Sequence, residues 1–249
     1  MSAVRWVELD GCANFRDIGG QLAGSGQRVG YGRLFRSDTL DSLSEADHHR
    51  FDELNVATVI DLRSTSEIEQ RGRLDLGRHD VAYFHVPLMD VVGDWSEWDP
   101  VDAARPEYPI EGYLQMLLSA EKRVAEVLEI LARPEALPAV FHCIAGKDRT
   151  GLVAALVLGL LDVAPDAIAA EYALSEGRNR HSKAPEELKR AFPLVFGAPS
   201  QNMAGVLAAV TQEHESIAAY VEHLGVSNDA VERLRTALLE PGNASADQP

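Results

Sequence analysis

The chain has 249 residues, of which 46% are hydrophobic and 25% charged, and its formal net charge at pH 7 is −16. This length and apolar content suit one large α/β domain, which we expect to span residues 1–240. The negative charge argues against nucleic acid or an anionic membrane as a bulk partner. It still allows a phosphate substrate in a local positive cup.

The cysteine content and the start of the chain bear on where the protein works. Cys12 and Cys143 provide no disulfide framework, which is typical of a reducing compartment. The first residues lack the apolar core of a signal peptide. The longest apolar run, 152–161, is far shorter than the ~20 residues that span a bilayer. We therefore expect a cytoplasmic protein, although export without a signal peptide is compatible with this sequence.

Residues 1–40 predict irregular structure with short strands. Asn-Phe-Arg-Asp-Ile-Gly-Gly at 14–20 is typical of a turn closed by two glycines, in which Arg16 and Asp17 are a candidate local ion pair. A second distinctive motif, Gly-Arg-Leu-Phe-Arg-Ser, occupies 32–37.

The next stretch predicts one helix and two strands. Ser44, with Asp47 three residues later, forms a capping box that starts a helix ending near Leu54. Residues 56–63 and 81–88 are rich in β-branched and aromatic side chains, which predicts two strands.

Arg63 lies at the end of the first of these strands, and two roles are open to it. Ligands of open α/β sheets bind at the carboxyl ends of the strands, so Arg63 is a candidate second substrate contact. The alternative is a structural ion pair with Asp61 or Glu67.

Residues 89–109 are rich in Asp, Trp and Pro and predict a long loop. Loops of this length in compact domains tend to be functional or mobile. We expect Trp95 and Trp98 to anchor this loop.

Helical periodicity dominates the rest of the chain. Residues 111–132 predict a helix with a break near Ser119. The segment 150–163 is apolar on all sides and predicts a buried central helix, and Pro165 opens another helix.

Residues 184–215 contain two helical patterns separated by the apolar link 192–199, and we consider this range a candidate helical lid. Ser216 and Ser227 are good caps for two final helices. Residues 241–249 predict a disordered tail.

The stretch from 139 to 152 combines the features of a phosphate-binding nucleophile. An apolar strand ends at His142, a loop holds Cys143 and Arg149 with five residues between them, and a helix opens at Thr150. A helix N-terminus and a guanidinium favour the nucleophilic thiolate. Backbone N–H groups at such a helix start bind a dianion, and the arginine fork matches two phosphate oxygens.

The other residues of this loop have predicted supporting roles. Gly146 allows the tight turn, Lys147 adds positive charge at the rim of the cup, Thr150 offers its hydroxyl to the sulfur, and His142 orients the loop from behind. The residues that we expect to bind the phosphate are Ile144, Ala145, Gly146, Lys147 and Thr150.

The string His-Cys-x-x-Gly-Lys-Asp-Arg-Thr-Gly between a strand and a helix is highly specific. It resembles the signature of cysteine-dependent phosphatases, and its ending is similar to a bacterial tyrosine or dual-specificity branch with lipid phosphatase activity. The two N-terminal motifs and Val-Ile-Asp-Leu-Arg-Ser at 59–64 resemble the same branch. The resemblance implies an α/β fold with a central, mostly parallel sheet flanked by helices, and extra C-terminal helices that form a lid.

The resemblance also implies the reaction, which is phosphomonoester hydrolysis without a metal or other cofactor. Cys143 would form a thiophosphate intermediate, with Arg149 and the loop amides carrying the developing charge. The general acid is Asp148, within the signature, or Asp90, where related phosphatases carry an acid-bearing loop. The implied substrate is a phosphotyrosine protein, with broad specificity; a phosphoinositide as main substrate is the alternative.

Two other classes of protein use a similar loop. One is a non-catalytic phosphate-binding module, which has no need of the Cys143 thiol. The other is a rhodanese-like sulfur carrier, against which the loop length and the Arg-Thr-Gly ending favour phosphate.

Overall fold

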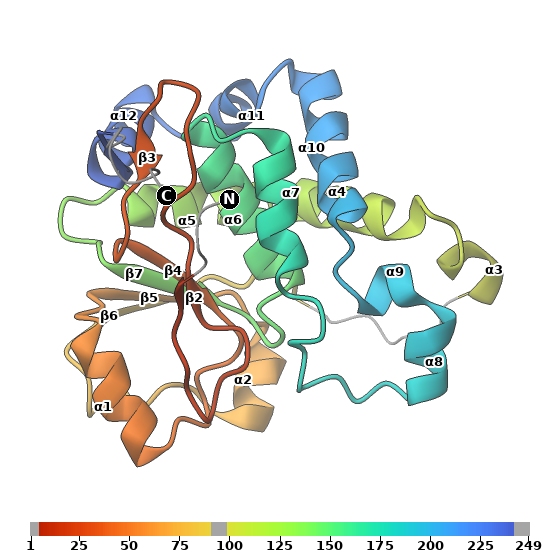
Figure 1. The fold of residues 1–249 in the computed structure, drawn as a ribbon, viewed down its shortest axis with the longest axis horizontal. Coiled ribbons are helices and arrows are strands. Elements are labelled where there is room, and N and C mark those ends of the chain that lie inside the picture. The colour runs from red at the N-terminus through yellow and green to blue at the C-terminus, as the bar shows by residue number, and fades with distance from the viewer. Residues whose placement is uncertain (1–4, 91–98, 242–249) are drawn as a thin grey trace, which may run out of the picture.

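The computed structural model describes residues 5–90 and 99–241 of the chain (Figure 1). In this part of the chain the central sheet has the order β1-β2-β4-β7-β5-β6. The strands β4, β7, β5 and β6 pair in parallel, and β1 and β2 extend one edge in antiparallel fashion. The predicted mostly parallel sheet is therefore confirmed. The strands are β1 (Arg5–Trp6), β2 (Arg16–Asp17), β4 (Leu34–Ser37), β5 (Thr58–Asp61), β6 (Ala82–His85) and β7 (Ala139–His142).

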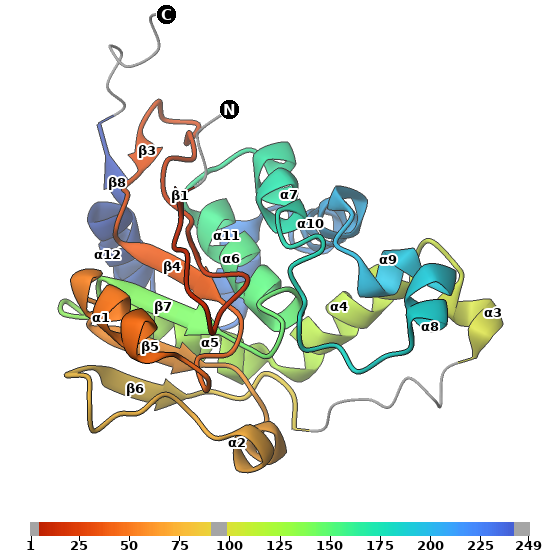
Figure 2. The same cartoon turned by 60° about the horizontal axis from the view of Figure 1, so that its bottom comes forward.

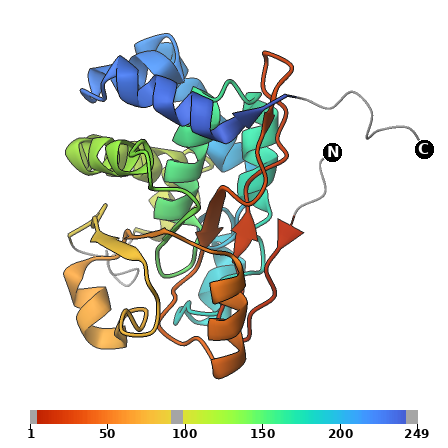
Figure 3. The ribbon, with the colours of Figure 1, turned by 90° about the vertical axis from the view of Figure 1, so that its left-hand side faces the viewer.

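Helices cover both faces of this sheet. Figure 1 shows α1 and α2 on one side and the larger group, with α4 to α7 and α10 to α12, on the other. A separate pair, β3 (Arg28–Val29) and β8 (Leu239–Glu240), joins segments from near the two ends of the chain (Figure 3). The helices are α1 (Glu45–Glu53), α2 (Thr65–Arg71), α3 (Pro100–Ala103), α4 (Tyr108–Ser119), α5 (Glu121–Leu131), α6 (Asp148–Leu160), α7 (Pro165–Ala173), α8 (Glu186–Ala191), α9 (Pro193–Phe196), α10 (Ser200–His214), α11 (Ile217–His223) and α12 (Asn228–Leu238).

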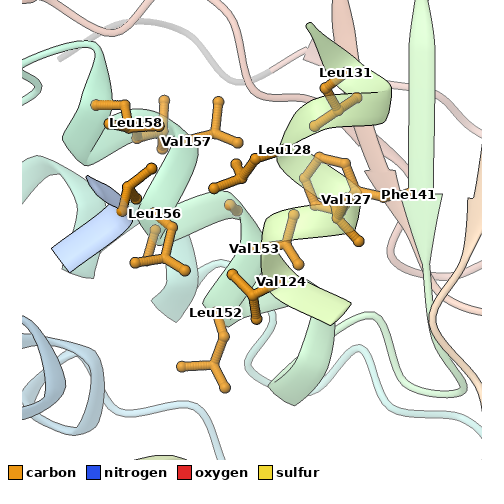
Figure 4. Close-up of a cluster of buried hydrophobic side chains, with 14 of the residues drawn as sticks. Val124, Val127, Leu128, Leu131, Phe141, Leu152, Val153, Leu156, Val157 and Leu158 are labelled. Carbon is orange, nitrogen blue, oxygen red and sulfur yellow. The ribbon is translucent and has the colours of Figure 1, made fainter. Parts of the chain in front are cut away.

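The central strands β4, β5 and β7 are buried along their whole length because neighbouring side chains on a strand enter two different cores. The core beside α1 contains Phe35, Val59 and Val140, together with Phe51 of that helix. The core beside the larger helical group contains Leu34, Ile60 and Phe141. Figure 4 shows Phe141 facing the apolar side chains of α5 and α6.

Helix α6 is the buried central helix that the sequence predicts. Both Leu152 and Val157 are at most 1% exposed, on different faces of the helix. The helix begins at Asp148 instead of Thr150, so Asp148 and Arg149 lie in its first turn. No helix within 5–90 and 99–241 is long and apolar enough to cross a bilayer.

The other predicted elements are largely confirmed. Ser44 caps α1 in a capping box, Ser216 and Ser227 cap α11 and α12, and a break follows Ser119 between α4 and α5. The expectation of a loop throughout 89–109 was wrong. Asp99 caps α3 and a proline follows at its first position, so a short helix begins there. Trp95 and Trp98 lie outside the described residues.

The structure divides the range 184–215 into two parts. Helix α10 belongs to the main core, where Met203 and Val206 are at most 2% exposed. Helices α8 and α9 have no fully buried residue and lie with α3 at one end of the molecule (Figure 2). The lid expectation can therefore apply to α8 and α9 only.

Candidate active site

The loop between β7 and α6 is held from behind by its carbonyl groups. The Ile144 carbonyl accepts from the amide of Thr39 at 3.2 Å, and Asn14 Nδ2 donates to the carbonyls of Ala145 and Gly146 at 2.9 and 3.1 Å. Because a trans peptide points its C=O and the following N–H in opposite directions, the next amides turn away from the body of the protein. Such a row of amides forms an anion-binding concavity.

Gly146 is required at the sharpest point of this loop. Its φ is +63°, and a Cβ there would lie 2.6 Å from the backbone of Ser37 and of Asp38. Both the left-handed conformation and this close approach exclude a side chain. The predicted tight turn at Gly146 is confirmed.

Two arginines from the N-terminal motifs lie behind the same loop. Arg16 Nε and Arg36 Nη1 donate to the carboxylate of Glu171 at 2.7 and 2.6 Å, and both arginines are fully buried. Arg36 also donates to the carbonyl of Gly146 at 2.6 Å. The predicted Arg16–Asp17 ion pair is wrong, because the Asp17 carboxylate accepts backbone N–H groups instead. Residues of the N-terminal motifs therefore help to hold the loop between β7 and α6 in place.

Arg149 is oriented by a carboxylate that the sequence reasoning did not link to it. Its Nη1 and Nη2 donate to the two oxygens of Glu67 at 2.5 and 2.8 Å. Burial alone would lower the pKa of Arg149, but Glu67 and the nearby Cys143 sulfur raise it above its ordinary value. Glu67 is itself held by the capping box that it forms with Ser64 at the start of α2. The guanidinium therefore stays charged and keeps one orientation beside the loop.

The ammonium of Lys147 lies beneath α9 and not at the open rim of the cup. It donates to the carbonyls of Val195 and Gly197 at 2.9 and 3.0 Å and lies 2.9 Å from Oδ1 of Asp148. These contacts use all three protons of the ammonium, and its side chain is 4% exposed. The predicted rim position is wrong because the end of α9, almost fifty residues away in sequence, satisfies this charge instead.

Asp148 stands at the start of α6 with a partly exposed carboxylate. Its Oδ1 accepts a hydrogen bond from the Tyr113 hydroxyl at 2.5 Å, and its side chain is 35% exposed. Burial would raise its pKa, but Lys147 and Tyr113 hold that pKa below its ordinary value. Asp148 is therefore ionised in the free protein, and a bound phosphate, as a like charge, would favour its protonated form.

Comparison of the sequence with known proteins shows to which family the chain belongs. The sequence pattern described as the tyrosine phosphatase family matches residues 7–240. This chain belongs to the tyrosine phosphatase family.

Several known phosphatases are similar to it. The chain is 29% identical to the triple specificity protein phosphatase PtpB of Mycobacterium tuberculosis, over 93% of this chain and 98% of that protein. It is 30% identical to a tyrosine-protein phosphatase of Nostoc commune, over 83% of this chain and 74% of that protein. Among solved structures, TpbA of P. aeruginosa aligns at 15% identity with a TM-score of 0.33, over 83% of this chain and 97% of that one.

The remaining candidate residues of this tyrosine phosphatase differ in their surroundings. Arg63 is fully buried, and its guanidinium binds Asp61, Asp41 and the hydroxyl of Thr39. A substrate contact by Arg63 would require these bonds to break, so its position fits the structural alternative. Asp90 is exposed and immediately precedes the undescribed segment 91–98.

His142 and Thr150 are buried on either side of the loop. His142 Nδ1 lies 3.4 Å from the carbonyl oxygen of Cys143, and burial lowers the pKa of the ring. Oγ1 of Thr150 has no hydrogen-bond partner among the described residues, so the expected hydrogen bond to the Cys143 sulfur is not formed in this structure. His, Cys, Asp and Glu side chains form no cluster suited to a metal ion in the described part of the phosphatase.

Selective alkylation tests whether Cys143 is the activated thiol of the phosphatase. Cys143 and Cys12 are 1% and 4% exposed, so burial does not distinguish them. Their charged neighbours do, because the Asp38 carboxylate adds to burial in raising the pKa of Cys12, whereas Cys143 interacts with the guanidinium of Arg149. We expect iodoacetamide at mildly acidic pH to label Cys143 first, and phosphate or vanadate to slow that reaction. Equal labelling of both cysteines, measured by peptide mass spectrometry, would contradict an activated thiol.

Proposed function

We propose that this tyrosine phosphatase hydrolyses phosphotyrosine and, with broad specificity, other phosphomonoesters through a thiophosphate on Cys143. The observation that carries the proposal is the loop itself, with Cys143 at one end and Arg149, held by Glu67, at the other. The broad specificity is supported by the similarity to a relative named for triple specificity.

The proposed reaction has two chemical steps, formation of the thiophosphate and its hydrolysis. The Cys143 sulfur attacks phosphorus while the bond to the leaving oxygen breaks, and that oxygen takes the proton of Asp148. Water then attacks phosphorus, Asp148 takes a proton from it, and the S–P bond breaks to release phosphate and the thiolate. Arg149 and the loop amides balance the charge on the phosphoryl oxygens in both steps.

We propose Asp148, and not Asp90, as the acid. Asp148 lies next to Arg149 in the first turn of α6, with part of its carboxylate exposed. Asp90 is exposed in the loop that follows β6 and would have to be carried to the leaving group by that loop.

Phosphoinositides as the main substrate receive less support. Besides the resemblance to a lipid-capable branch, a lysine charge at the rim would favour such a polyanionic substrate, but the Lys147 ammonium is engaged by α9 and Asp148. Family membership and the Cys143 thiol likewise favour a phosphatase over a phosphate-binding module or a sulfur carrier.

A substrate panel tests the proposal. Phosphotyrosine, phosphoserine and phosphothreonine peptides, a phosphoinositide and thiosulfate would be offered to the full chain, with phosphate release or sulfur transfer as the measurement. We expect the highest kcat/KM on phosphotyrosine and lower turnover of the other phosphates. Preference for the phosphoinositide would make it the main substrate, and phosphate binding or sulfur transfer without hydrolysis would overturn the proposal.

Asp148→Asn tests the identity of the acid. A basic leaving group such as the tyrosyl oxygen needs a proton, whereas an activated aryl leaving group departs without one. We expect Asp148→Asn to lower kcat on phosphotyrosine about 10²-fold and to change turnover of an activated aryl phosphate only about threefold. The basic limb of its pH–rate profile should flatten, because that limb reports loss of the acid's proton.

Asp90→Asn is the matched control, since it removes a carboxylate charge without touching the loop. We expect it to have the smaller effect on both substrates. The opposite ranking would transfer the role of acid to Asp90 and leave Asp148 as a residue that shapes the loop.

A further inference from the structure

Among the described residues, the contacts that hold the carboxylate of Asp148 reach only one of its oxygens. The Tyr113 hydroxyl donates to Oδ1 at 2.5 Å, and the Lys147 ammonium lies 2.9 Å from the same atom. Neither contact involves Oδ2. An oxygen that accepts two such contacts is a poor place for a proton, so protonation is directed to Oδ2.

A second tyrosine determines the direction of the bond from Tyr113. The hydroxyls of Tyr113 and Tyr172 lie 2.7 Å apart. An ionised carboxylate can only accept, so Tyr113 gives its single proton to Asp148 and must accept the bond from Tyr172. The hydrogen bonds therefore run in one direction, from α7 through α4 to the first turn of α6.

Packing holds both tyrosines in place. Tyr113 is 6% exposed and Tyr172 1%, and their rings meet edge to face at a centroid distance of 6.2 Å. Burial and Asp148 raise the pKa of Tyr113, and burial raises that of Tyr172. Both hydroxyls therefore keep their protons across the pH range in which a phosphatase is assayed.

We propose that Tyr113, supported by Tyr172, is a positioning residue that holds Asp148 by Oδ1 and leaves Oδ2 to carry the transferred proton. This inference rests on the proposed role of Asp148 as the acid. A carboxylate free to rotate would present either oxygen to the leaving group, so anchoring raises the fraction of productive orientations.

Other charged groups also face this carboxylate. Lys147 and Arg149 lower the pKa of Asp148 together with Tyr113. The charge of Glu176 in turn raises the pKa of Lys147. The variants below leave all of these charges in place. A shift in the pH profile can therefore be assigned to the lost hydroxyl.

Tyr113→Phe tests the proposal, because it removes the hydroxyl and keeps the ring. Without this donor the carboxylate is less stabilised and its pKa rises, so the basic limb of the pH–kcat/KM profile should move to higher pH. We expect kcat on phosphotyrosine to fall about three- to tenfold and turnover of an activated aryl phosphate to stay unchanged. Tyr172→Phe, which removes the bond that supports Tyr113 together with the contact of the Tyr172 hydroxyl to Asn202, should act in the same direction with a smaller effect.

Tyr220→Phe is the matched control for loss of a buried tyrosine hydroxyl. Tyr220 lies on α11, is 4% exposed, and its hydroxyl has no hydrogen-bond partner within the described residues. We expect no change in the pH profile or in the ratio of the two substrates. Thermal unfolding of all three variants separates loss of stability from loss of positioning.

The Asp148→Asn background distinguishes failure of this inference from failure of the proposed function. If Tyr113 acts through Asp148, adding Tyr113→Phe to Asp148→Asn should have no further effect on phosphotyrosine. If Asp148→Asn slows both substrates equally, Asp148 is not the acid and the proposed function fails at that point. If Asp148→Asn shows the leaving-group dependence but Tyr113→Phe lowers both rates equally without moving the basic limb, only the positioning role is overturned.

Discussion

Cys143→Ser is expected to lower phosphatase turnover more than about 10³-fold and to leave the unfolding temperature within about 4 °C of the wild type. The serine hydroxyl stays protonated near neutral pH and is a much weaker nucleophile than the cysteine sulfur that lies beside Arg149 and the start of α6. The two side chains are nearly equal in size, so the buried position can hold either. Phosphate release and thermal unfolding measure the two effects.

Cys12→Ser is the matched control for this substitution. Cys12 is also buried, and its sulfur lies 3.4 Å from the carbonyl oxygen of Thr39, a bond that a serine hydroxyl can replace. We expect this variant to keep its activity. Turnover by Cys143→Ser within about tenfold of the wild type would remove Cys143 as the nucleophile.

Arg149→Lys is expected to cost about 2–4 kcal/mol of transition-state stabilisation, or about 30- to 900-fold in kcat/KM. An arginine fork can bind Glu67 with one side of its guanidinium and keep N–H groups for a phosphate. Lysine presents a single point of charge, which Glu67 would compete to hold. The loss should fall mainly on kcat, because the charge on the phosphoryl oxygens develops in the transition state.

Arg235→Lys controls for the loss of a guanidinium elsewhere in the fold. Its Nε donates to the carbonyl of Leu160, at the opposite end of α6 from the catalytic loop. We expect the Arg235→Lys variant to keep nearly normal values of kcat and KM. A higher KM with normal kcat in Arg149→Lys would mean that Arg149 contributes to ground-state binding alone.

The local elements of the site were predictable from neighbouring residues. The apolar run before His142, the turn at Gly146 and the apolar helix that follows are each indicated by residue types within a few positions, although the close approach of Ser37 and Asp38 to Gly146 is tertiary. The backbone of such a strand–loop–helix unit depends on local sterics and hydrogen bonding. The nucleophile and the arginine could be assigned for the same reason, since both belong to this one unit.

The sequence by itself also determined where the helices with a clear cap or a proline at their first position begin, namely α1, α7, α11 and α12, because such start signals are properties of adjacent residues. Only the tertiary structure decided the partners of the charged groups. Glu67 lies 82 residues from Arg149, and Glu171 lies 155 residues from Arg16. No local pattern indicates which buried carboxylate a guanidinium will meet. Burial makes an unpaired charge very costly, so the packing of distant elements settles each pair, including the contact that takes Lys147 away from the rim.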